Sequence, residues 1–149
     1  MENATDFIFH GREARSRGDR DAARAGYSRA AELYLAEGLT LSWAHAVRHV
    51  ADMWLEEEQL DEARTLYQQA LNAYRGSLET RILDLSNTVR PYALLNEVTG
   101  QTELARSLWL EAKTLYAAIR IDEGVAECEK HLVILSRSNQ TAGEPHSSP

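Results

Sequence analysis

Residues 63–70 read Ala63-Arg-Thr-Leu-Tyr67-Gln-Gln-Ala70, and this pattern of alanine, aromatic residue and alanine occurs three times in the chain. The copies are Ala23-x-x-x-Tyr27-x-x-Ala30, Ala63-x-x-x-Tyr67-x-x-Ala70 and Ala105-x-x-x-Trp109-x-x-Ala112. From Ala23 to Ala63 is 40 residues, and from Ala63 to Ala105 is 42 residues. Residues i, i+4 and i+7 share one helix face, so each copy predicts a helix whose small residues admit a neighbouring helix while the ring fills the gap.

A turn signal precedes each copy: Gly18-Asp19, Glu58-Gln59 and Gly100-Gln101. Glycine at the end of a helix supplies a left-handed cap, so each copy is predicted to be helix, tight turn, helix. Ala, Leu, Glu and Arg dominate residues 4–136, and no strand pattern competes. The expected helices span residues 4–17, 20–36, 41–57, 60–76, 79–99, 102–118 and 122–136.

Small residues inside the first helix of each pair complete the pattern; they are Gly11, Ala51 and Ala93. A helix A, a tight turn and a helix B that carries alanine, aromatic, alanine resemble the tetratricopeptide repeat. The long period is similar to that of kinesin light chain and of some bacterial regulators. The chain departs from the family pattern in its period, in the missing proline that closes each repeat and in the second turn, which lacks glycine. The resemblance implies an all-α, right-handed superhelical stack of three repeats, with residues 122–136 as a C-terminal capping helix.

The predicted domain organisation is one helical-repeat domain over residues 1–136. Residues 137–149 are polar and contain glycine and proline, which predicts a disordered C-terminal tail. Pro91 falls inside the third A helix and removes a backbone donor, so a kink is expected there.

Charge and composition narrow the classes of partner. The chain has 149 residues, with 23 acidic against 16 basic and a net charge of −7, so nucleic acid is not an expected partner. No leader-like N-terminus and no apolar run of roughly 18 residues is present, so membrane insertion is not expected. Cys128 is the only cysteine, which excludes an internal disulfide and fits a reducing, cytoplasmic compartment.

Histidines four residues apart, His45 and His49, are the nearest approach to a metal motif. The zinc-protease pattern places glutamate directly after the first histidine, and here that residue is Ala46. We therefore predict no metal site. Phosphate-loop and nucleophile-elbow motifs are also missing, so we predict no cofactor and no enzyme activity.

In tetratricopeptide proteins the A helices line a concave groove that holds a partner segment. Carried over to this chain, the groove-facing positions are Ile8, Arg12, Arg15, His45, Arg48, Asp52, Leu55, Asn87, Arg90, Leu94 and Glu97. Arg48 and Arg90 occupy the same repeat position, and guanidinium groups bind carboxylates with two hydrogen bonds. The alternative is that each is a surface arginine paired within its own helix, as Arg48 would be with Asp52 one turn later.

The resulting hypothesis is a protein-binding adaptor whose groove accepts an acidic segment or a C-terminal peptide. Members of the family that bind chaperones use asparagines to hold a terminal carboxylate, and the matching positions here are His10, His49 and Pro91. The alternative hypothesis is a helical-repeat protein that associates with itself and has no peptide ligand.

Overall fold

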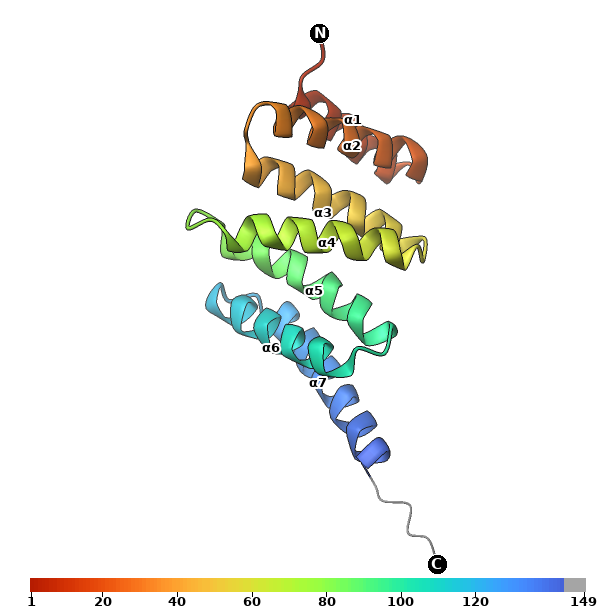
Figure 1. The fold of residues 1–149 in the computed structure, drawn as a ribbon, viewed down its shortest axis with the longest axis vertical. Helices are drawn as coiled ribbons and strands as arrows, with labels where there is room; N and C mark the ends of the chain where they lie inside the picture. The colour runs from red at the N-terminus through yellow and green to blue at the C-terminus, as the bar shows by residue number, and fades with distance from the viewer. Residues whose placement is uncertain (144–149) are drawn as a thin grey trace, which may run out of the picture. The chain divides into compact units, whose positions relative to one another are not determined.

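A computed structural model of the chain describes the backbone of residues 1–143 and the side chains through Ser138. Over these residues the protein is all-α, with helices in the order shown in Figure 1 and no strand. The helices are α1 (Ala4–Ser16), α2 (Arg20–Ala36), α3 (Thr40–Glu56), α4 (Leu60–Arg75), α5 (Ile82–Val98), α6 (Thr102–Ala118) and α7 (Asp122–Gly143). The predicted all-α class and helix-turn-helix pattern are therefore confirmed.

The described chain divides into two compact units, and the division falls inside α5 between Thr88 and Val89. In the first unit α1 packs on α2, α2 on α3 and α3 on α4; in the second unit α6 packs on α7. Helix α5 continues through Pro91, so the proline does not end the helix. The single domain over residues 1–136 and the kink at Pro91 stay predictions.

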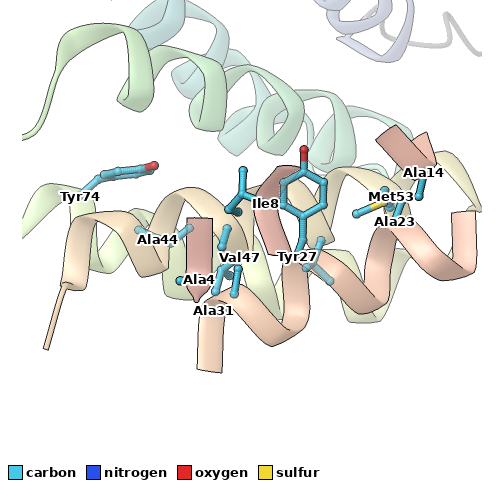
Figure 2. Packing of buried hydrophobic residues seen from close by; sticks show 14 residues of the cluster. Ala4, Ile8, Ala14, Ala23, Tyr27, Ala31, Ala44, Val47, Met53 and Tyr74 are labelled. Atoms are coloured by element: carbon cyan, nitrogen blue, oxygen red, sulfur yellow. The ribbon is translucent and has the colours of Figure 1, made fainter. Parts of the chain in front are cut away.

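The repeated triplets lie on α2, α4 and α6, and every one of their nine residues is 1% exposed or less. Gly11 shows why helix A needs a small residue: a Cβ built there would lie 3.0 Å from the ring of Tyr27. Figure 2 shows Tyr27 in the core of the first unit, which Val47 and Met53 of α3 also enter. In the second unit Trp109, Tyr116, Cys128 and Leu135 are buried.

All five tight turns share one left-handed geometry. Among the described residues, those with positive φ are Gly18, Gly38, Glu58, Gly100 and Arg120. At the first turn Gly18 N–H donates to Arg15 O at 3.0 Å and Asp19 N–H donates to Ala14 O at 2.9 Å, which is the Schellman arrangement. Glu58, with φ of 60°, adopts the same conformation without being glycine, so the second predicted turn forms although its residue carries a Cβ.

Helix α7 continues to Gly143, so the predicted helix end at residue 136 was wrong. Elongating an existing helix adds one backbone hydrogen bond per residue, which polar residues do not prevent. The hydroxyl of Ser138 donates to Ile134 O at 3.1 Å within this extension. Of the tail predicted over 137–149, residues 137–143 belong to α7, and residues 144–149 lie outside the described part of the chain.

Candidate functional site

The predicted site residues His45, Arg48 and Asp52 of α3 form, together with His49, a polar strip along one side of the helix. His45, Arg48, His49 and Asp52 follow helical spacing, and all four are half-buried. The strip belongs to the first unit, as do Arg12 and Arg15 of α1.

Asp52 is held by two neighbours. Arg48 Nη1 donates to its Oδ2 at 2.8 Å, and the hydroxyl of Tyr67 on α4 donates to its Oδ1 at 2.5 Å. The side chains of Arg48 and Asp52 are only 15% and 16% exposed. Burial raises the pKa of Asp52, while the charge of Arg48 and the hydrogen bond from Tyr67 act in the opposite direction. Arg48 therefore has an acidic partner within its own helix.

His49 lies flat against Tyr27 of α2, with ring centroids 4.6 Å apart and planes 14° from parallel. Its Nε2 is 3.3 Å from Nε2 of His45. Burial, followed by the charge of Arg48, lowers the pKa of His49 to about 2, and the same two causes lower the pKa of His45. Both imidazoles are consequently neutral at pH 7 and add no positive charge to the strip.

The two arginines of α1 differ in their surroundings. Arg15 forms an ion pair with Glu56 at the end of α3. Arg12 is exposed and makes no hydrogen bond or ion pair with any described residue. It is nevertheless near the strip, because its charge contributes to the lowered pKa of both His45 and His49. Arg12 is thus a predicted site arginine whose guanidinium group is open to a partner.

The predicted residues of α5 fall on both sides of the division. Asn87 is half-buried in the first unit, whereas Arg90 and the half-buried Leu94 belong to the second. Arg90 binds both carboxylate oxygens of Glu127 on α7, with Nη2 2.8 Å from Oε2. That hydrogen-bonded pair lowers the pKa of Glu127, although burial opposes it. Arg90, like Arg48, has an acidic partner inside the protein.

Two contacts in the site were not predicted, the stack of Tyr27 on His49 and the hydrogen bond from Tyr67 to Asp52. A signal for the first exists in the sequence, since His49 follows Tyr27 by 22 residues and His131 follows Trp109 by 22 residues. His131 stacks on Trp109 with centroids 4.1 Å apart and planes 7° from parallel. The repeat spacing therefore places a histidine of the next A helix on the repeat aromatic in both units.

The C-terminal ends of α2 and α4, the N-terminal parts of α3 and α5 and the turn between α4 and α5 surround a hollow of about 300 Å³, which His45, Tyr74 and Asp84 line. No group of three or more His, Cys, Asp or Glu side chains among the described residues is arranged to hold a metal ion. Within residues 1–143, no helix is both long and apolar enough to cross a membrane.

Comparison with known proteins adds no family assignment: the chain matches no protein-family model and no curated protein.

Proposed function

We propose that this protein is a tetratricopeptide-type interaction module that binds an acidic segment of another protein, with Arg12 as the main charged contact. The observation that carries the proposal is the exposed Arg12 guanidinium, which has no acidic partner among the described residues and lies beside the polar strip of α3. An unpaired guanidinium group favours a carboxylate, which it can bind with two hydrogen bonds, over a neutral or basic group.

Arg15 and Arg48 supply a second layer of contacts in this proposal. Arg15 is 34% exposed in its pair with Glu56, and pairs of this exposure contribute about 0.2–1 kcal/mol, so a ligand carboxylate can replace Glu56 at small cost. Arg48 is more deeply buried, and exchange of Asp52 would leave a buried carboxylate that keeps only Tyr67. We therefore rank Arg12 first, Arg15 second and Arg48 last as contacts of the ligand.

The repeat pattern supports the tetratricopeptide assignment through its buried triplets, its small helix-A residues and its glycine-type turns. The buried, unpaired Cys128 is compatible with a cytoplasmic setting. The role is that of an adaptor and requires no cofactor or catalytic group.

The experiment compares wild type with Arg12→Glu in affinity capture from the native cell's lysate and in titrations with acidic peptides. Arg17→Glu is the matched control, because Arg17 is exposed at the end of the same helix. We expect Arg12→Glu to lose the captured partner and to weaken peptide binding about tenfold or more, while the control binds as wild type. Binding of wild type should weaken as ionic strength rises.

Peptides with a free C-terminus and with an amidated C-terminus distinguish recognition of a terminal carboxylate from recognition of acidic side chains. Equal capture by wild type and Arg12→Glu would contradict the proposal and place the ligand elsewhere.

Self-association is the second candidate, because Val133 and Ile134 of α7 are 49% and 42% exposed. A protein that associates through this helix shows a mass that rises with concentration in sedimentation, and Ile134→Lys should return it to a monomer. A strict monomer at high concentration would remove this candidate.

A further inference from the structure

The hollow of the first unit has a lining that suits a cationic group. Its volume of about 300 Å³ is at the lower end of small-molecule sites, which is the size for a small amine or for the end of one long side chain. The lining residues that matter to the argument are Tyr34, Ser42, His45, Tyr74, Arg81 and Asp84.

Tyr74 contributes a hydroxyl group that the protein itself does not use. The residue is 2% exposed, yet its hydroxyl oxygen has no hydrogen-bond partner among the described residues. Figure 2 shows the hydroxyl end of the ring on the side of the ring that lies towards α3. An unsatisfied buried hydroxyl costs about 1–3 kcal/mol, so phenylalanine would be the better residue here if Tyr74 served packing alone.

Asp84 contributes a carboxylate to the same hollow. The residue is half-buried, and its side chain makes no hydrogen bond or ion pair with a described residue. The charge of Asp84 acts on both Tyr74 and His45. After burial it is the second cause of the raised pKa of Tyr74, and it opposes the lowering of the pKa of His45. A carboxylate-bearing residue and a tyrosine therefore line the same partly open hollow.

The remaining charges of the lining do not neutralise Asp84. Glu79 and Arg81 are both exposed at the turn and carry opposite charges, and His45 is held neutral by burial. The charges of the lining side chains therefore sum to a negative value, while the positive charge of Arg48 also acts on His45 and Tyr74 from outside the lining. The lining also includes Tyr34, an aromatic residue of the kind that attracts cations, and Ser42, whose side chain can accept a hydrogen bond.

We propose that this hollow binds an alkylammonium or guanidinium group, with Asp84 as the counter-ion and the Tyr74 hydroxyl as a hydrogen-bond acceptor. The group is supplied either by a small free amine or by a lysine or arginine side chain of a partner. The site is separate from the Arg12 contact, so either proposal can fail while the other stands.

The test is a titration of the isotope-labelled full chain, followed by amide chemical shifts in NMR. The probes are butylguanidinium, butylammonium and the neutral isostere butylurea at constant ionic strength. Saturable shifts are expected around Ser42, His45 and Asp84 with both cations, and none of comparable size with butylurea. Equal responses to butylguanidinium and butylurea would overturn the proposal.

Two variants assign the contacts. Asp84→Asn and Tyr74→Phe should each weaken cation binding about tenfold, because the first removes the negative charge that faces the cation and the second removes a hydrogen-bond acceptor. Tyr74→Phe should at the same time keep or raise the thermal midpoint, which a purely structural hydroxyl would not do. Asp61→Asn on the exposed face of α4 is the matched control and should bind as wild type. Unchanged binding by both hollow variants would overturn the assignment.

Capped tripeptides with one lysine or arginine identify the source of the cation. Competition by these peptides supports a partner side chain, and binding of free amines alone supports a small-molecule ligand.

Discussion

The hydroxyl of Tyr67 donates a 2.5 Å hydrogen bond to Oδ1 of Asp52, so a core residue of the repeat also orders the polar strip of α3. The ring of Tyr67 is fully buried, and only its hydroxyl reaches the strip. The second unit repeats the arrangement with other residues, since Trp109 Nε1 donates to Glu97 Oε1 at 2.9 Å. In both units an aromatic residue of the repeat packs in the core and also donates a hydrogen bond to a carboxylate on a neighbouring helix.

Tyr67→Phe should therefore destabilise the protein by about 1.5–3 kcal/mol, because it removes a hydrogen bond from a buried carboxylate. Tyr74→Phe is the matched comparison, since the Tyr74 hydroxyl has no partner among the described residues and its loss should be neutral or stabilising. Urea unfolding followed by circular dichroism measures both. Equal losses in the two variants would show that the hydrogen bond to Asp52 contributes nothing specific.

Glu58→Gly should stabilise the first unit by roughly 0.5–1 kcal/mol. Glu58 has φ of 60°, a conformation that costs a residue with a Cβ about 1–2 kcal/mol in the folded state. Glycine avoids this strain, but its greater freedom in the unfolded chain offsets roughly 0.5–1 kcal/mol of the gain. Gly18→Ala is the reverse experiment: a Cβ there meets nothing within 4 Å, so any loss reports the backbone conformation alone. A lower thermal midpoint for Glu58→Gly would contradict this reading of the turn.

Gly26→Ala should destabilise the protein by about 1–3 kcal/mol. A Cβ at Gly26 would lie 3.0 Å from Cα and N of Gly11 and from O of Phe7, and backbone atoms cannot move aside as a flexible side chain can. Ala25→Ser, an exposed change on the same helix, is the control and should stay within about 0.5 kcal/mol of wild type. Thermal unfolding compares the variants, and a tolerated Gly26→Ala would argue against the close contact of α1 and α2.

Acid should destabilise the first unit through His49. The pKa of His49 is about 2 in the folded protein, against an ordinary value of 6.5. Between pH 6.5 and 2, His49 is therefore protonated in the unfolded chain but not in the folded protein. As pH falls from 6.5 towards 2, this difference in the protonation of His49 lowers the free energy of unfolding by about 1.4 kcal/mol per pH unit. The groups whose charge opposes protonation of His49 are Arg48, His45, Arg15 and Arg12. The raised pKa of Asp52 acts in the opposite sense at the acidic end.

His49→Phe keeps a ring against Tyr27 and should flatten the dependence of unfolding free energy on pH between 6.5 and 4. His10→Gln, at an exposed position, is the control and should leave the slope as in wild type. An unchanged slope in His49→Phe would assign the acid sensitivity to other groups.

Cys128 should report the opening of the second unit. Its side chain is fully buried, and burial raises the pKa of its thiol to about 11, so the reactive thiolate is scarce and shielded at pH 8. Reaction with a thiol reagent such as Ellman's reagent should be slow in the native protein and should accelerate in urea in parallel with loss of the second unit's structure. Immediate reaction in native buffer would contradict the burial of this thiol.

The helices and most of their ends were predictable because their signals are local. The alanine and aromatic triplets follow the helical period, and glycine at Gly18 and Gly100 marks the left-handed turns. The end of α7 was missed because polar residues such as Ser138 neither favour nor forbid one more helical turn.

The sequence by itself determined the all-α class, the helix pairs and the buried ring of each repeat, since all three depend on spacings of three to seven residues along one helix. The pairing of Arg48 with Asp52 could also be predicted, because the two residues lie four positions apart on one helix. Only the tertiary structure decided that Arg15 meets Glu56, 41 residues away, and that Arg90 meets Glu127, 37 residues away. An arginine is open to a partner only if the packing of the helices brings no carboxylate within about 3 Å of it. That packing involves helices far apart in the chain, so the local sequence does not determine it.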